Sequence, residues 1–289
     1  MNSGVPRQSE SLPSVDLDAP PEAVWAAVTE PEQVARWFGT LSAPLRTGLD
    51  NRLDFGDGDF FTLRPTRIEP PVSLSYEWRF LGIEDPALVE WTLTPRAGGG
   101  TRVVVRHLEA DGSATTRPEL LDGWRDFLSR LVRYLSSGSS SRYLLRDSID
   151  GSVTLPAGSF RPLREPELFG WLPVAIDGFV PRWFFIIDDE GPRRFAIGDW
   201  RLTPDVGLSC RIEIPGADRP TACSVSARGG ASGLRLDFVH EGWTRLGLPD
   251  RSSTLLRRRF AATWIASLRS ARDLAGSPAG PAGPPGGAA

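Results

Sequence analysis

The same pattern of residues occurs twice along this chain, at a spacing of about 134 residues. Glu30-Pro31-Glu32 returns as Glu165-Pro166-Glu167, and the run that ends at His107 returns as the run that ends at His240. Two identities share an offset of 134: Leu74 with Leu208, and Ser75 with Ser209. A solenoid unit is only about 20–50 residues long, so this repeat indicates a duplicated domain.

The length of the chain and its linker composition place the boundaries. A chain of 289 residues favours two domains, and each copy is long enough to bury a core. A serine-rich stretch at 136–141 is typical of a linker, and the last residues are glycine, proline and alanine. We therefore expect domains at 12–136 and 148–275, a linker at 137–147 and a disordered tail at 276–289.

Hydrophobic periodicity predicts the same order of elements in both copies. In the first copy it predicts one strand and two short helices that begin at Pro20 and Pro31. Further strands follow at 51–55, 59–67, 73–80, 88–95 and 101–108, and one long helix follows at 119–135. In the second copy Gly158 and Pro162 interrupt the first helix. We expect strands there at 152–155, 182–187, 193–202, 208–214, 222–227 and 233–240, and a closing helix at 252–274.

This order predicts an α+β fold of two tandem helix-grip domains. In each domain a curved antiparallel sheet wraps around a long C-terminal helix, with two short helices beside it, because the apolar stripe of that helix must be buried. The first helix of the second domain is expected to be degenerate. A strongly bent sheet that grips one helix leaves room for a cavity between them.

Three motifs resemble those of a known family. They are the run from Pro21 to Glu32 followed by Trp37-Phe38-Gly39, the segment from Trp91 to His107 with its glycine-rich turn, and a closing helix with Gly123-Trp124. Together they resemble the START and Bet v1-like helix-grip superfamily, in the branch of the Hsp90 ATPase activator homologue. Tandem proteins of this kind are similar to proteins encoded in enediyne antibiotic clusters of the dynemicin and calicheamicin type, some of which confer self-resistance.

No catalytic constellation is evident in the sequence. It contains no nucleophile-elbow, phosphate-loop or zinc-protease motif. Because the chain has two histidines, a histidine-based site must use His107 or His240, which occupy equivalent positions. Each histidine either caps the end of its strand through a backbone partner or acts as a polar or acid–base group at a cavity mouth. Glu109 shares a strand face with His107.

Ten tryptophans supply the strongest clue to a ligand. Each can pack in the core, but aromatic walls with a few polar groups also suit a planar apolar ligand. Our candidate ligand-binding residues are Trp78, Trp91, Trp124 and Phe127 in the first domain, and Trp183, Trp200 and Trp264 in the second.

The net charge and the cysteine content limit the classes of partner that we expect the protein to bind. The net charge is −3 and every basic residue is an arginine, so we expect no nucleic-acid partner, and Arg257-Arg258-Arg259 is interpreted as a solvated helix face. Cys210 and Cys223 lack neighbours at metal spacing, so no metal or cofactor is expected. No apolar run is long enough for a membrane span, which favours a cytoplasmic protein without a membrane partner.

Three functions remain open from the sequence. The leading hypothesis is non-catalytic binding, sequestration or transport of a hydrophobic aromatic small molecule in secondary metabolism or self-resistance. The second is a polyketide cyclase or aromatase-like enzyme that uses the same cavity, as the superfamily resemblance suggests. The third is a chaperone-interacting module, as the Hsp90-activator resemblance suggests, although the sequence identifies no protein partner.

Overall fold

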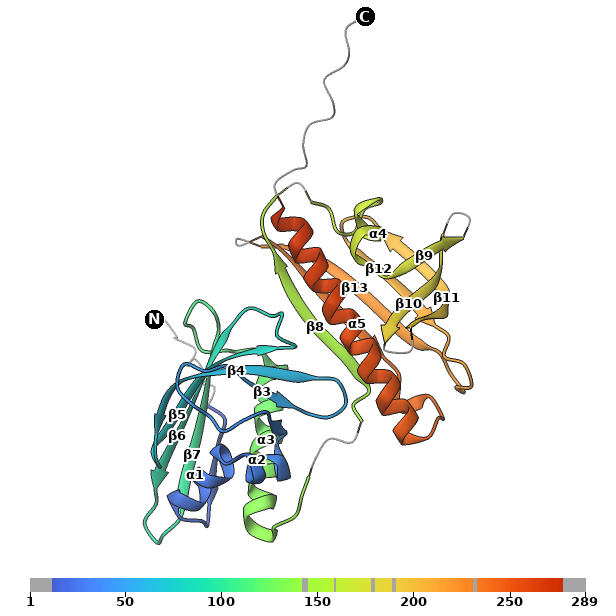
Figure 1. Cartoon of the computed structure of the whole chain (residues 1–289). Helices are drawn as coiled ribbons and strands as arrows, with labels where there is room; N and C mark the ends of the chain where they lie inside the picture. The colour runs from blue at the N-terminus through green and yellow to red at the C-terminus, as the bar shows by residue number, and fades with distance from the viewer. Residues whose placement is uncertain are drawn as a thin grey trace, which may run out of the picture. The chain divides into compact units, whose positions relative to one another are not determined.

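The computed structural model describes residues 12–141, 145–158, 160–177, 180–188, 191–230 and 233–277. The chain divides into two compact units, Met1–Leu144 and Leu145–Ala289, and each contains one antiparallel sheet and one long helix (Figure 1). The predicted α+β class with two domains is therefore confirmed. Residues 1–11 and 142–144, and 278–289 of the predicted tail, lie outside the described residues.

The first unit has a strand, two short helices, a meander of strands and one long helix. Its elements are β1 (Ser14–Leu17), α1 (Pro21–Thr29), α2 (Pro31–Trp37), β2 (Thr40–Leu41), β3 (Asn51–Asp54), β4 (Phe60–Glu69), β5 (Ser73–Phe80), β6 (Ala87–Pro95), β7 (Thr101–Leu108) and α3 (Pro118–Ser137). Three helices begin with proline, whose absent N–H would have no partner in the first turn. Gly138 ends α3 with a positive φ of 68°, which costs glycine little.

The second unit repeats this order with one helix fewer before the meander. Its elements are β8 (Ser148–Leu155), α4 (Glu167–Trp171), β9 (Val174–Asp177), β10 (Val180–Asp188), β11 (Gly191–Thr203), β12 (Gly207–Ile212), β13 (Thr221–Gly230), β14 (Gly233–Glu241), the 3-10 turn η1 (Trp243–Arg245) and α5 (Asp250–Gly276). The segment with Gly158 and Pro162 forms no helix in its described residues. The short strands β2 and β9 were not predicted.

The two sheets have the same strand order. It is β1-β7-β6-β5-β4-β3-β2 in the first unit and β8-β14-β13-β12-β11-β10-β9 in the second. The strand registers agree as well, since Leu74 pairs with Trp91 in β6, and Leu208 pairs with Val225 in β13. The 134-residue offset between Leu74 and Leu208 is therefore a structural equivalence.

One tertiary hydrogen bond has been kept although α1 has no counterpart in the second unit. The indole N–H of Trp37 donates to the carbonyl of Ala27 at 2.9 Å, and that of Trp171 donates to the carbonyl of Pro162 at 2.8 Å. The two acceptors are 135 residues apart, which is also the offset between the two Glu-Pro-Glu motifs. The second unit has thus lost the helix but kept the backbone acceptor in place.

Each long helix buries one stripe against its own sheet. On α3 the buried residues recur at helical spacing, at Leu121, Trp124, Leu128 and Leu131. Figure 1 shows α5 running diagonally across the second sheet, where it buries Phe260, Trp264, Leu268 and Ala271. The four candidate residues of the first domain, and Trp264 of the second, lie between helix and sheet.

Candidate functional site

The four candidate residues of the first domain meet in one aromatic cluster. Trp78 stacks on Trp124 with ring centroids 4.9 Å apart, and Trp91 meets the same ring edge-on at 5.6 Å. Phe127, one turn further along α3, lies edge-on to Trp124 at 5.7 Å. The three tryptophans are buried and Phe127 is half-buried. The fold therefore brings these residues together between β5, β6 and α3.

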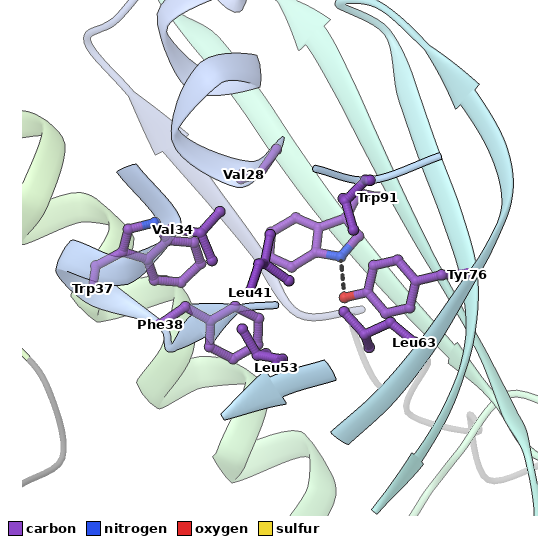
Figure 2. A pocket seen from close by; sticks show the side chains of 10 residues that line it. Val28, Val34, Trp37, Phe38, Leu41, Leu53, Leu63, Tyr76 and Trp91 are labelled. Carbon is purple, nitrogen blue, oxygen red and sulfur yellow. Dashed lines mark hydrogen bonds between the residues drawn. The ribbon is translucent and has the colours of Figure 1, made fainter. Parts of the chain in front are cut away.

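A small hollow adjoins this cluster on the side of α2 (Figure 2). Its volume is about 20 Å³, which is room for one water molecule. Trp91 lines it together with Trp37 and Tyr76, and the indole N–H of Trp91 donates to the Tyr76 hydroxyl at 2.9 Å. Burial raises the pKa of Tyr76, so this hydroxyl stays protonated. Aliphatic and aromatic side chains together fill the interior around this hollow.

His107, on β7, accepts a hydrogen bond at Nδ1 from the indole N–H of Trp124, at 3.2 Å. An accepting Nδ1 carries no proton, so the ring is neutral with its proton on Nε2. Burial lowers the pKa of His107, while the charge of Glu109 raises it and that of Arg117 lowers it. The partner of this histidine is thus a helix side chain, where the sequence suggested a backbone group or Glu109.

His240, on β14, lies in the equivalent arrangement and is buried completely. Its Nδ1 accepts from the indole N–H of Trp264 at 3.1 Å. Its Nε2 lies 2.8 Å from the hydroxyl of Thr221, which in turn donates to the carbonyl of Ile212 at 3.3 Å. Burial, together with the nearby positive charge of Arg257, lowers the pKa of His240 to about 3. This imidazole is neutral at physiological pH.

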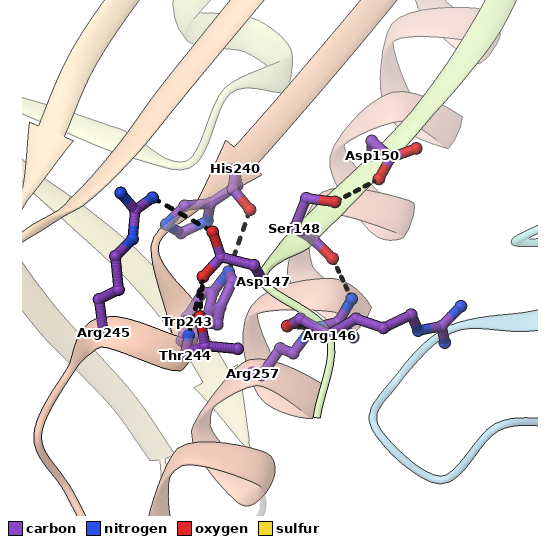
Figure 3. Close-up of polar contacts among 9 residues, drawn as sticks. All are labelled: Arg146, Asp147, Ser148, Asp150, His240, Trp243, Thr244, Arg245 and Arg257. Atoms are coloured by element: carbon purple, nitrogen blue, oxygen red, sulfur yellow. Dashed lines mark hydrogen bonds and ion pairs between the residues drawn. The ribbon is translucent and has the colours of Figure 1, made fainter. Parts of the chain in front are cut away.

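Arg257 is buried as well, in contrast to the solvated helix face predicted for Arg257-Arg258-Arg259. Its Nε donates to the carbonyl of Arg146 at 3.1 Å, and its terminal nitrogen donates to the carbonyl of Ser148 (Figure 3). Consecutive residues of a helix point about 100° apart, so three in a row cannot share one face. Of the three, Arg258 is the exposed one.

Asp147 holds the start of β8 to the turn after β14 (Figure 3). Its carboxylate accepts from the backbone N–H of Thr244 at 2.9 Å and pairs with Arg245 at 3.1 Å. Burial alone would raise the pKa of Asp147, but the bonds from Thr244 and the charge of Arg245 outweigh it and lower the pKa. Together with Arg257, this carboxylate makes the end of the domain near His240 a structural anchor.

The structure does not bring the three candidate residues of the second domain together. Trp264 is buried between Phe184 and Phe238, with ring centroids 5.5 and 5.2 Å away. Trp183 precedes Phe184 in β10 and therefore points to the opposite face, where the guanidinium of Arg194 lies 4.5 Å above its ring. Trp200 is half-buried at an irregularity in the pairing of β11.

A larger pocket in the second domain lies between the first turns of α5 and β11. Its volume is about 390 Å³, within the usual range of ligand pockets. It is lined by Arg193, Arg194, Phe195, Ile214, Pro215, Leu248, Ser252, Leu255, Leu256 and Arg259. The sequence reasoning missed these residues because it searched for tryptophan. The available signal was an apolar pair in the first turns of the closing helix, followed one turn later by arginine.

Two sheets of identical strand order, each holding one long helix, define a tandem helix-grip protein. The model of the family described as activator of Hsp90 ATPase homolog 1-like protein matches residues 18–136, the first domain. With the full-length relative described next, this match shows that the chain belongs to that family.

Solved structures resemble the chain to different extents. DynU16, a protein in the dynemicin biosynthetic locus, is 47% identical over 91% of this chain and 97% of its own, with a TM-score of 0.84. CalU16 from Micromonospora echinospora is 30% identical over 43% of this chain and 74% of its own, with a TM-score of 0.35. StfQ, a di-domain ARO/CYC of the steffimycin pathway, is 14% identical over 91% and 97%, with a TM-score of 0.36. No curated protein matches the chain.

The likeness to DynU16 confirms the predicted resemblance to proteins of enediyne loci. Within the described part of the chain, no helix is long and apolar enough to cross a membrane. Nor do the described residues contain a group of three or more His, Cys, Asp or Glu side chains that could hold a metal ion.

Proposed function

We propose that the protein binds a hydrophobic aromatic small molecule of the polyketide or enediyne type, and sequesters or carries it without transforming it. The observation that carries this proposal is the 390 Å³ pocket beside α5 in the second domain. A molecule of several fused rings fits such a volume, whereas the 20 Å³ hollow of the first domain has no room for one. The first domain then has mainly a structural role, because its aromatic residues fill its own core.

The walls of the pocket suit an apolar ring system. Phe195 is buried and meets Phe260 of α5 edge-on at 4.9 Å, which fixes its orientation. Ile214 and Leu256 contribute aliphatic surface to the same pocket. Burial of apolar ligand surface contributes about 25 cal/mol per Å², so even a modest ring system gains several kcal/mol of binding free energy.

The state of the histidines favours binding over catalysis. Nδ1 of each is held by a tryptophan, and burial lowers the pKa of both rings. A general acid or base is most effective when its pKa lies near the working pH. His240 is far below that range, and its Nε2 is already engaged by Thr221. The setting of DynU16 in an antibiotic locus is consistent with a ligand from secondary metabolism.

A fluorescence titration with a neutral hydroxylated anthraquinone tests the proposal. We expect saturable binding that Leu255→Trp abolishes, because the larger side chain occupies the pocket. Leu274→Trp is the matched control, since Leu274 is an exposed leucine at the far end of the same helix. Equal binding by the wild type and Leu255→Trp would show that the pocket is not the site.

A second function, an enzyme of the cyclase or aromatase kind, is favoured by one observation. His107 is slightly exposed, and the ion pair between Glu109 and Arg117, at 3.3 Å, lies near enough to shift its pKa. An enzyme of this kind would lose turnover of a poly-β-ketone substrate in His107→Ala while keeping ligand affinity. A conversion rate that is unchanged in His107→Ala would remove this alternative.

A further inference from the structure

We infer that the pocket of the second domain recognises a hydrophobic carboxylic acid, that is, an apolar ring system bearing one carboxylate. This inference rests on the proposed function, and it adds the charge of the ligand to it.

The polar side chains of the pocket are almost all cationic. Arg193 comes from β11, where it shares the face of Phe195, and Arg259 comes from α5, so the pocket has an arginine on each of two elements. Arg194 lies between Arg193 and Phe195 in the strand, and its side chain therefore points to the opposite face of the sheet, over Trp183. Ser252 is the one other residue with a polar side chain among those that line it, and none of them is acidic. The whole chain carries a net charge of −3, so this local excess of positive charge runs against its overall balance. A ligand with a single negative charge matches it.

The geometry of arginine suits a carboxylate. A guanidinium group has five N–H donors in its plane, so one that already has a protein contact keeps donors for a ligand. Arg193 and Arg259 are therefore the two residues whose guanidinium groups can donate to a ligand carboxylate in this pocket.

The apolar walls lie directly beside these charges. Phe195 lies two residues after Arg193 in β11, on the same face of the strand, and Leu256 lies one turn before Arg259 in α5. A ring system against Phe195 and Leu256 places a substituent on its edge near Arg193 and Arg259. Bound apolar surface also excludes water from the ion pair, which strengthens it. An acid should therefore bind more tightly than an uncharged molecule of the same shape.

The test compares anthraquinone-2-carboxylate with anthraquinone-2-carboxamide, which have the same ring system and nearly the same size. Isothermal titration of the full chain should show the carboxylate binding about 10-fold more tightly, the factor expected for one charge-assisted pair. Arg193→Gln and Arg259→Gln should each remove most of this preference and leave amide affinity within about 2-fold. Arg258→Gln, an exposed neighbour outside the pocket, should change neither affinity.

The possible results distinguish failure of the carboxylate preference from failure of the proposed binding function. Equal affinity for acid and amide, with both lost in Leu255→Trp, would overturn the inference and leave apolar binding in this pocket intact. No binding of either compound would overturn both. A preference for the acid that persists in Arg193→Gln and in Arg259→Gln would also overturn it, because the charge would then be recognised elsewhere. Thermal unfolding of each variant confirms that the comparison is between folded proteins.

Discussion

The indole N–H of Trp264 donates to Nδ1 of His240 at 3.1 Å, from the long helix of the second domain to its last strand, β14. Trp124 and His107 make the same bond at 3.2 Å in the first domain. The histidines are 133 residues apart and the tryptophans 140, so the pair was kept while the connection between strand and helix changed length. This bond ties the helix to the sheet in both copies.

Removal of the donor should destabilise the second domain. In Trp264→Phe the buried Nδ1 of His240 loses its partner and the smaller ring leaves a void. We expect a loss of about 3 kcal/mol in the free energy of unfolding, measured by denaturant titration. Trp200→Phe, at a half-buried strand position, is the control and should cost less than about 1 kcal/mol. Similar losses in both variants would contradict a special role for the bond.

The low pKa of His240 predicts how stability depends on pH. In the unfolded chain the imidazole takes up a proton below about pH 6.5, whereas in the folded protein its pKa is about 3. Between these two pKa values the unfolded state thus binds more protons than the folded state. As the pH falls through this range, the free energy of the unfolded state therefore falls relative to that of the folded state. The stabilisation is complete above about pH 6.5 and is lost as the pH falls toward 3.

Denaturant titrations between about pH 5 and 7 test this dependence, because unfolded carboxylates titrate mostly below this window. One histidine contributes a slope of at most about 1.4 kcal/mol per pH unit. His240→Gln should flatten the dependence for the second domain. His107→Gln should do so for the first domain, since burial also lowers the pKa of His107. An unchanged slope in His240→Gln would contradict the lowered pKa, because it would mean that His240 takes up its proton over the same pH range in the folded and the unfolded chain.

The aromatic cluster of the first domain should behave as a packed core. Trp91→Ala removes a ring that contacts Trp37 and Trp124 and donates to Tyr76, so we expect a loss of about 3–5 kcal/mol. Added indole should refill the cavity and restore part of the melting temperature. Trp183→Ala, on the opposite face of its sheet, should gain nothing from indole. A Trp91→Ala variant that is as stable as the wild type would contradict this packing.

The two cysteines should be unreactive in the folded protein. Cys210 and Cys223 face each other across β12 and β13, and both are buried. Burial raises the pKa of Cys223, and its contact with Cys210 raises it further, so little thiolate is present at neutral pH. Intact-mass measurement after iodoacetamide treatment should show no adduct in buffer and two in concentrated guanidinium chloride. An adduct in buffer would mean that this part of the sheet opens readily.

The sequence predicted what depends on local periodicity. Residue alternation and the 134-residue repeat indicated the strands and the duplication, and the equivalence of Leu74 with Leu208 holds in the strand register. The two histidines were recognised as equivalent, but the hydrogen bond that each accepts from a tryptophan of the closing helix was not predicted. Those partners lie on a helix 17 and 24 residues further along the chain, and only tertiary packing brings them close.

The site was harder to predict because the burial of a residue in a strand or helix depends on which face of that element the residue occupies. Trp183 and Phe184 are neighbours, yet only Phe184 faces the helix, and no local signal distinguished them in this largely apolar strand. Arg257 and Arg259 differ in the same way, one buried against the start of β8 and the other in the pocket wall. The pocket combines four separate segments, a proximity that no spacing in the sequence reveals.

The most direct test of the central claim is to count bound ligands by native mass spectrometry with the neutral hydroxylated anthraquinone in excess. We predict one ligand per chain for the wild type and for Leu274→Trp, and none for Leu255→Trp. Two ligands per chain, or one that persists in Leu255→Trp, would contradict the account and place binding outside the pocket between α5 and β11.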